Sequence, residues 1–172
     1  MLLSPIESTA ILQREWIQKK PRISQKFGEN PALYAPFNMK GHNGVDFAIP
    51  VGTPIFAPCD GKVKVVITPD GYGKHIKLRS SHGAREIVLG HLSEFDVKDG
   101  DTVNMGQLLG LSGNTGFSTG AHLHMGLRFL KPAQGDIFKW GVVDYNNGYY
   151  GYVDCLPNLI CYKGGYETYT IL

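Results

Sequence analysis

Side chains that can bind a metal ion occur in pairs at two distant places in the chain. His42 and Asp46 lie four residues apart, and His122 and His124 lie two residues apart. A fifth candidate, His91, lies between the two pairs. Two imidazoles and one carboxylate with an open position form a ligand set of catalytic zinc sites, in which the open position holds water. These residue types therefore predict a metal-dependent hydrolytic site.

The spacing of both pairs fits a β-strand, in which alternate side chains share one face. On a helix, residues two apart point about 200° away from each other, so His122 and His124 could not reach one site. His42 and Asp46 likewise share the polar face of a strand that we predict over residues 42–49. The opposite, apolar side of the second strand is predicted to face the core with Leu123, Met125 and Leu127.

The four histidines of these motifs are more than one metal ion needs. Zinc lowers the pKa of bound water towards neutrality, so hydroxide exists at working pH. The two remaining imidazoles could take the proton of the attacking water, donate to a leaving amine, or stabilise the oxyanion. No competing nucleophile is evident, because the cysteines lie outside these motifs and no Gly-x-Ser-x-Gly pattern occurs. The five residues are therefore predicted to converge on one metal ion and to cleave a peptide bond.

The other histidines are predicted to lie outside this site. His75 shares a strand face with Lys77 and Arg79, so we expect it to point to solvent. His82 falls in a predicted turn. His91 itself follows contiguous apolar residues, so alternation does not indicate where its side chain points.

The elements that must position these residues are predicted to be mainly β. Period-two patterns from residue 23 onward and a high glycine and proline content predict an antiparallel sheet or sandwich with a substrate groove. We predict one short helix within residues 8–17, in an N-terminal arm of residues 1–20. Residues 21–172 are predicted to form one domain, with its core at about 23–128 and an aromatic-rich extension at 129–172.

Two aromatic-rich segments have alternative interpretations. The predicted loop at residues 29–40 is long, and long loops without structure of their own are usually functional. Its side chains Tyr34 and Phe37 either contact a substrate or cover the edge of the core. In the extension, Trp140 and the tyrosines either pack on the core or line the groove, since aromatic rings stack on sugar rings and peptide planes.

Composition excludes several classes of protein. The formal net charge is +2, and no basic run suggests nucleic-acid binding. No apolar stretch approaches membrane-spanning length, and the first residues lack the pattern of a secretory signal peptide. The three cysteines show no Cys-x-x-Cys spacing, so buried or free thiols are expected, with a Cys155–Cys161 bridge as the alternative.

The three motifs in this order resemble the M23 metallopeptidases, the lysostaphin and LytM-like peptidoglycan endopeptidases. The match comprises His42-x-x-x-Asp46, His91 in Gly-His-Leu-Ser, and His122-x-His124 after Gly-Asn-Thr-Gly, within about residues 23–128. The resemblance implies an antiparallel β fold with a groove and a zinc ion held by His42, Asp46 and His124. It implies that His91 and His122 form the catalytic pair, which polarises the water and stabilises the tetrahedral intermediate. The implied substrate is a peptide bond in the stem or cross-bridge of bacterial peptidoglycan.

This chain departs from the family pattern before the middle histidine. The family commonly has an aromatic residue two positions before it, where this chain has Leu89. We therefore expect Tyr34 to donate to the oxyanion instead. The segment from residue 26 to residue 47 resembles phage or prophage members, which implies an enzyme that reaches the cell wall from a virion or at lysis and needs no signal peptide.

Two rival classes stay open. An iron(II) oxygenase also uses two histidines and a carboxylate, and metal identity and oxygen dependence would separate it from a peptidase. A non-catalytic β module that binds cell wall or regulates another enzyme would be expected to lack at least one of the five residues, whereas all five are present.

Overall fold

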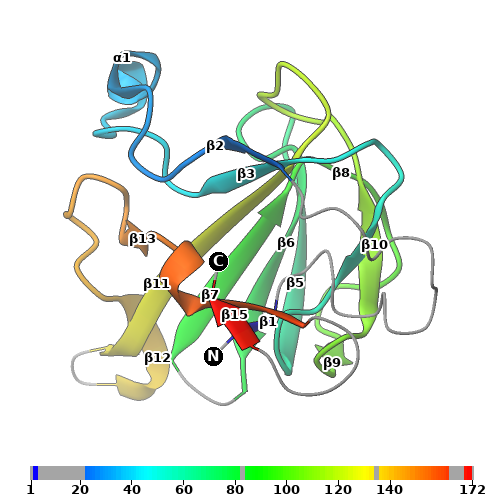
Figure 1. Cartoon of the computed structure of the whole chain (residues 1–172). Coiled ribbons are helices and arrows are strands. Elements are labelled where there is room, and N and C mark those ends of the chain that lie inside the picture. The colour runs from blue at the N-terminus through cyan, green and yellow to red at the C-terminus, as the bar shows by residue number, and fades with distance from the viewer. Residues whose placement is uncertain (1, 4–21, 82–83, 134–135, 163–168, 172) are drawn as a thin grey trace.

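The largest sheet of the protein is antiparallel and carries nine strands. The structure is a computed structural model that describes residues 2–3, 22–81, 84–133, 136–162 and 169–171 (Figure 1). The sheet has the order β2-β3-β11-β7-β6-β5-β9, and two further strands, β12 and β13, pair with β11. Its strands are β2 Arg22–Gln25, β3 Val45–Ala48, β5 Gly61–Ile67, β6 Lys74–Ser80, β7 Arg85–Gly90, β9 Thr102–Val103, β11 Leu123–Ala133, β12 Asp136–Val142 and β13 Tyr152–Val153.

A smaller antiparallel sheet of three strands, in the order β4-β10-β8, packs against one face of the large sheet. Its strands are β4 Pro54–Phe56, β8 Leu92–Phe95 and β10 Leu108–Ser112. A third sheet joins the two chain ends and consists of β1 Leu2–Leu3, β14 Leu159–Tyr162 and β15 Tyr169–Ile171. The predicted antiparallel β fold is confirmed, and one hydrophobic cluster fills the space between the first two sheets.

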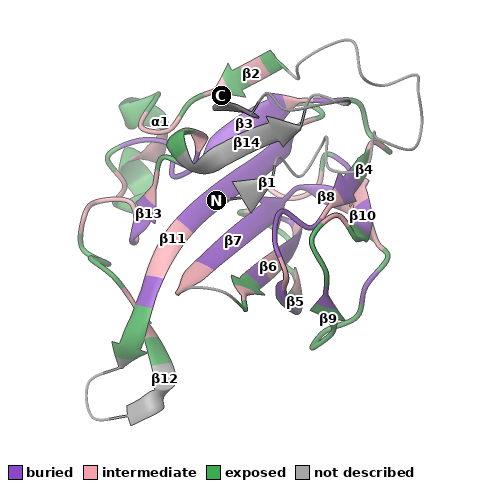
Figure 2. Ribbon diagram, turned by 60° about the horizontal axis from the view of Figure 1, so that its bottom comes forward, coloured by how far each residue is buried: buried purple, intermediate pink, exposed green. Residues whose placement is uncertain are grey.

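The core follows the predicted alternation along β11. Leu123, Met125 and Leu127 are fully buried and belong to the cluster between the two sheets. Figure 2 shows that β3, β7 and the first half of β11 form the buried centre of the large sheet, whereas the far end of β11 is exposed. Burial of such apolar side chains contributes roughly 1.5–3 kcal/mol each, so the centre of the sheet is a rigid support.

The strand order brings all three motif segments together. β11 lies between β3 and β7, and His124 is the register partner of Asp46 on one side and of Gly90 on the other. His91 directly follows Gly90, and His122 directly precedes β11. The start of β11, the end of β7 and the start of β3 therefore meet at one end of the sheet.

Two short helical segments lie within the predicted loop at residues 29–40. α1 Pro31–Tyr34 and the 3-10 turn η1 Ala35–Phe37 follow each other there, so the expectation of a loop without structure was wrong. Asn30 and Asn38, both with left-handed backbones, bound the helical pair, and a proline in the first turn favours its start. A second 3-10 turn, η2, spans Leu156–Asn158.

The short helix predicted within residues 8–17 lies outside the described residues. Among the helices that the structure describes, none is long and apolar enough to cross a membrane.

Candidate functional site

Three potential metal ligands converge at the junction of β3 and β11. The Nε2 atom of His42 lies 3.0 Å from Nδ1 of His124 and 3.2 Å from Oδ1 of Asp46. The same Asp46 oxygen lies 3.0 Å from Nδ1 of His124. All three side chains are buried, with 2–7% of their surface exposed. Three donor atoms in mutual contact in a buried place could hold a metal ion.

The protonation and orientation of these groups suit metal binding. Burial alone would raise the pKa of Asp46, but its contacts with the imidazoles of His124 and His42 outweigh burial and hold the pKa well below its usual range, so the carboxylate stays charged. His124 directs Nδ1 at the cluster, while its buried Nε2 has no hydrogen-bond partner among the described residues. Nδ1, which lies against Asp46 and His42, is therefore the atom of His124 that could bind a metal ion in this cluster.

Contacts with the backbone hold both histidines of this cluster. Nδ1 of His42 donates to the carbonyl oxygen of Lys26 at 3.2 Å, because a carbonyl can only accept; the lone pair of Nε2 then faces the cluster. Gly44 lies against the His124 ring, and a Cβ atom there would come within 2.5 Å of Cε1 of His124. Glycine between His42 and Asp46 therefore leaves the space that the facing imidazole occupies.

His91 and His122 lie side by side next to the cluster. Their ring centroids are 4.5 Å apart, and Nε2 of His122 lies 3.5 Å from Oδ2 of Asp46. Nδ1 of His91 donates to the carbonyl of Thr115 at 2.7 Å, and Nδ1 of His122 donates to the carbonyl of Gly120 at 2.7 Å. In the neutral form of each ring the proton is thus on Nδ1 and the lone pair on Nε2.

The backbone at His91 has an uncommon conformation for a residue with a side chain. Its φ angle is +62°, in the left-handed region, exactly where β7 ends and β8 begins. Such conformations cost energy and often mark functional sites. Burial lowers the pKa of His91 to about 4, so the ring is neutral at pH 7. The turn at residue 91 therefore presents a neutral imidazole to the cluster, a point that strand alternation could not indicate.

The five predicted residues line one cavity of about 400 Å³ together with Tyr34. The Tyr34 ring centroid lies 5.5 Å from that of His42, and its hydroxyl donates to Oε1 of Gln25 at 3.2 Å. Burial and the negative charge of Asp46 raise the pKa of Tyr34 to about 12, so the hydroxyl keeps its proton at neutral pH. Leu89, at the position where the family commonly has an aromatic residue, does not line this cavity, because its side chain is fully buried in the core.

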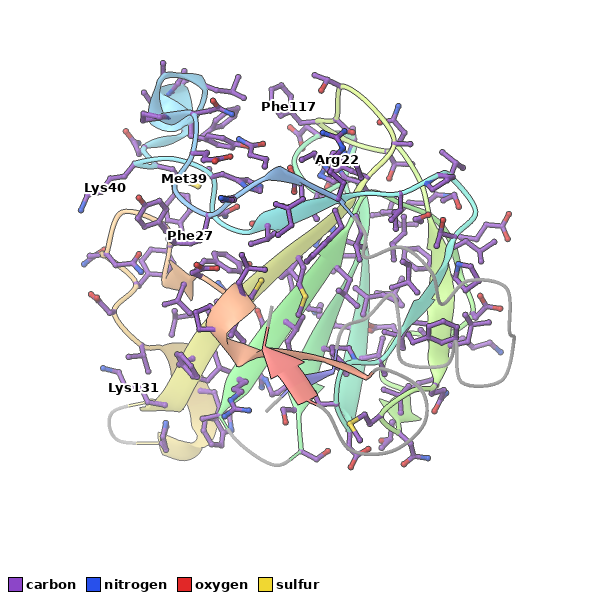
Figure 3. The ribbon with its side chains drawn as sticks, viewed as in Figure 1. Arg22, Phe27, Met39, Lys40, Phe117 and Lys131 are labelled. Atoms are coloured by element: carbon purple, nitrogen blue, oxygen red, sulfur yellow. The ribbon has the colours of Figure 1, made fainter. Side chains whose placement is uncertain are left out.

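Two exposed phenylalanines approach each other at this cavity from different loops. Phe37, at the end of η1, and Phe117, in the loop before β11, both line it, and their ring centroids are 5.9 Å apart. In Figure 3 the Phe117 side chain points towards the side of the molecule that carries α1 and Met39. About half of each side chain remains exposed, which leaves apolar surface that a bound molecule could cover.

The segment at residues 144–152 holds the first of these loops. The hydroxyl of Tyr150 donates to the carbonyl of Phe37 at 2.5 Å. Lys40 donates through its backbone N–H to the carbonyl of Gly148 at 2.9 Å and through Nζ to that of Asn147 at 3.1 Å. Part of the aromatic-rich extension therefore supports one wall of the cavity.

The other aromatic residues of the extension differ in exposure. Tyr149 packs against Phe27, and Tyr152 is buried, whereas Trp140 on β12 is 43% exposed and is not among the residues that line the cavity. The interpretation of a packed extension thus fits these two tyrosines. Cys155 is a buried free thiol, and Cys59 is another.

Tyr72 is a residue of the site that the sequence motifs did not indicate. Its ring lies 4.8 Å from that of His124, and its hydroxyl accepts a hydrogen bond from Nδ2 of Asn43 at 2.6 Å. Its carbonyl accepts the backbone N–H of His91 at 2.8 Å. Tyr72 follows a turn glycine and is remote in sequence from every motif, so only the Gly-Tyr-Gly turn itself could have drawn notice to it.

The prediction that His75 points to solvent was wrong. His75 is 3% exposed, because the Tyr72 ring packs against it with centroids 5.4 Å apart. Its Nδ1 donates to the carbonyl of Gly73 at 3.0 Å, and burial lowers its pKa. It stays outside the metal cluster, as predicted. His82 lies outside the described residues.

The chain is similar to known peptidases. The profile of Peptidase family M23 matches residues 40–136, more than half of the chain. The chain is 46% identical over 96 residues to the glycyl-glycine endopeptidase ALE-1 of Staphylococcus capitis, which covers 53% of this chain and 26% of that protein. It is 38% identical over 112 residues to the peptidoglycan DD-endopeptidase ShyA of Vibrio cholerae, which covers 65% and 26%.

A solved structure agrees with these matches. The catalytic domain of lysostaphin from Staphylococcus simulans superposes with a TM-score of 0.56 at 35% identity, covering 63% of this chain and 80% of that one. The chain spans only about a quarter of the length of the two curated relatives named above. The motifs, the buried cluster and the family profile agree, and the chain belongs to peptidase family M23.

Proposed function

We propose that this chain is a zinc-dependent endopeptidase that hydrolyses peptide bonds in the stem or cross-bridge peptides of bacterial peptidoglycan. The observation that carries the proposal is the contact of three buried donor atoms, from His42, Asp46 and His124, next to the imidazoles of His91 and His122. Relatives named as peptidoglycan and glycyl-glycine endopeptidases support the substrate class.

The donor set fits zinc in chemistry and in spacing. Two imidazole nitrogens and one carboxylate oxygen are a ligand set of catalytic zinc sites. With zinc–ligand bonds of about 2.0–2.1 Å, tetrahedral geometry separates neighbouring ligand atoms by roughly 3.3 Å. The three observed separations are 3.0, 3.0 and 3.2 Å. A zinc ion held by His42, Asp46 and His124 would supply Lewis acidity towards water and the scissile carbonyl.

His91 and His122 are the proposed catalytic pair, and they move protons. Each ring has its Nδ1 proton bound to a carbonyl oxygen, so each Nε2 lone pair is free to accept a proton from the attacking water. The imidazolium that forms can then donate that proton from Nε2 to the nitrogen of the leaving amine. The low pKa of His91 makes proton release from this ring especially favourable.

Tyr34 is the proposed donor to the oxyanion. Its hydroxyl keeps the proton at working pH and lies in the same cavity as the histidines. A hydrogen bond from a neutral phenol to the carbonyl oxygen would strengthen as negative charge develops there. The hydroxyl now donates to Gln25, so its O–H would have to rotate away from Gln25 to donate to the substrate carbonyl.

The proposed place of action is the bacterial cell wall, where the named relatives' substrate is found. The finer proposal of a phage or prophage enzyme, acting from a virion or at lysis, rests on the resemblance of residues 26–47 alone.

Digestion of purified peptidoglycans with different cross-bridges tests the proposal. We expect the wild type with zinc to release peptides with free amines, identified by mass spectrometry, and a chelator to abolish the release. Asp46→Ala should lose both bound zinc and activity, because the carboxylate is the only charged ligand. Release of reducing sugars, or activity that survives Asp46→Ala, would contradict the proposal.

The same purified enzyme can be used to distinguish a zinc peptidase from the rival class, an iron(II) oxygenase. Membership of a peptidase family favours hydrolysis. Equal product formation with and without oxygen, with zinc as the activating metal, is the expected result, whereas turnover that needs iron and oxygen would refute the zinc peptidase.

A further inference from the structure

The sheet face that carries the metal cluster continues into a cationic region. His124, Gly126 and Arg128 point to the face opposite the core, because the residues between them are buried core residues. The register carries this face across β7 to β6 and β5, which lie beside β7 on the side away from β3 (Figure 1).

Four cations occupy neighbouring positions on this part of the face. They form two directly opposed pairs on β5 and β6, Lys62 with Arg79 and Lys64 with Lys77. Side chains in such positions have Cβ atoms about 4.5–5.5 Å apart, and like charges there are destabilising. We call these four residues the basic strip.

Within the described residues, acidic side chains pair with little of the basic strip. Lys62 and Lys64 are exposed and Lys77 is half-buried, and within the described part of the chain none of the three forms an ion pair. Arg79 lies 3.7 Å from the buried carboxylate of Glu86, which the guanidinium of Arg128 already contacts. The basic strip and Arg128 together carry five positive charges beside the one carboxylate of Glu86. This local excess is larger than the net charge of the whole chain, which is +2.

Two acidic side chains beside β5 bind backbone groups. Oδ1 of Asp99 accepts the N–H of Val65 at 2.9 Å, and Oδ2 of Asp101 accepts that of Lys98 at 2.8 Å. They lie along the edge of β5, beside β9, and within the described part of the chain neither forms an ion pair with the strip.

The strip and the metal cluster are close enough to contact one extended molecule. Lys77 is two strands from His124 and two residues further along the sheet. With strands about 4.8 Å apart and about 3.4 Å per residue, the two Cα atoms are roughly 12 Å apart. Tyr72 and Tyr152 cover the glycines between them.

We propose that the basic strip binds a linear phosphodiester polymer of the cell wall and so holds the enzyme on the wall beside its substrate. Three of the four cations are lysines, whose ammonium groups act as flexible point charges suited to phosphate and tolerant of register. Opposed like charges are costly in the free protein, and a polyanion lying along the strip removes that cost. A repeating anionic chain also fits a two-by-two array better than a single small anion does.

Binding of end-labelled poly(glycerol phosphate), followed by fluorescence anisotropy between about 50 and about 200 mM NaCl, tests the proposal. The wild type should bind with an affinity that falls steeply with salt. Lys64→Gln/Lys77→Gln removes two contacts and should weaken binding by about tenfold or more. Two lost contacts should also reduce the slope of log affinity against log salt by roughly 1.4.

The matched control is Arg22→Gln/Lys131→Gln, which changes net charge equally at exposed positions away from the strip; Lys131 lies near the far end of β11 in Figure 3. It should bind like the wild type, and thermal melting should show both double variants folded. Equal loss in the control, equal binding of polyglutamate, or tighter binding of vesicles containing anionic lipid would overturn the proposal. The assay needs no hydrolysis, so its failure is distinct from failure of the proposed peptidase activity.

Discussion

The cluster of His42, Asp46 and His124 and the walls of the cavity are held in different ways. His42, Asp46 and His124 are buried where β3 meets β11; the His42 ring contacts the carbonyl of Lys26, and the His124 ring lies against Gly44. Phe37 and Phe117 project from two loops, and about half of each side chain is exposed. The proposed chemistry therefore rests on a rigid sheet, whereas the surface that meets a substrate can change without disturbing it.

Removing a proton-transfer group should have the largest effect. His91→Gln keeps a polar side chain but loses the proposed base, and general acid–base groups contribute about 10²–10⁴-fold to rate. We expect kcat/KM on a peptidoglycan peptide to fall within that range, while zinc content, measured by atomic absorption, stays at one per chain. Loss of zinc together with activity would instead make His91 part of the metal frame.

Displacing one of the proposed metal ligands, His124, should have the next largest effect. In Gly44→Ala the new Cβ would lie 2.5 Å from the His124 ring and 2.6 Å from the carbonyl of Met125, so the imidazole must move. Displaced ligand support typically costs about 10–100-fold in metal affinity. Competition with a fluorescent zinc chelator measures it, and Gly141→Ala, whose Cβ would meet no atom within 4 Å, is the control. Equal zinc affinity in the two variants would show that the frame is not rigid.

Changes in the walls should alter substrate binding and spare the metal. Phe117→Ala removes an exposed ring and its contact with Phe37, and such aromatic contacts are worth about 0.5–1.5 kcal/mol, or up to about tenfold. We expect KM to rise by that factor with little change in kcat or zinc content. Steady-state kinetics on cross-bridge peptides, with Trp140→Ala as the exposed aromatic control, checks this. A fall in kcat alone would place Phe117 with the catalytic groups instead.

The smallest expected effect concerns the contribution of His75 to the pH dependence of folding stability. Burial lowers the pKa of His75 in the folded protein below 6.5, so the unfolded chain binds a proton that the folded chain resists. Stability should therefore decline as the pH falls below about 6.5, and His75→Gln should make this decline shallower. Urea unfolding of metal-free wild type and variant from pH 7.5 to pH 5 compares the two slopes; parallel slopes would exclude a contribution from His75.

Strand periodicity predicted the core-facing side of β11, because alternation along a strand is a local property of the sequence. The alternation around His122 and His124 correctly assigned Leu123, Met125 and Leu127 to the core. The same logic failed for His75, because the ring that covers it comes from a turn outside its own strand.

The remaining contacts join segments that no local pattern relates. The carbonyls of Thr115 and Gly120 orient His91 and His122, and backbone acceptors leave no signature in residue type. The left-handed backbone of His91 could not be predicted either, because a histidine in the sequence does not indicate a positive φ angle as a glycine can. The helical turns at residues 31–37 were missed since four residues of helix carry almost no periodicity.

The support of one cavity wall by residues 144–152 has an evolutionary consequence. The loop that carries Phe37 and the segment that anchors it through Tyr150 both lie outside residues 40–136, the part that matches the family profile. Insertion, loss or recombination at the ends of the conserved unit could therefore exchange this wall as a cassette. A lineage could in this way change the surface that meets a substrate in one genetic event, while the sheet that carries His42, Asp46 and His124 is inherited unchanged.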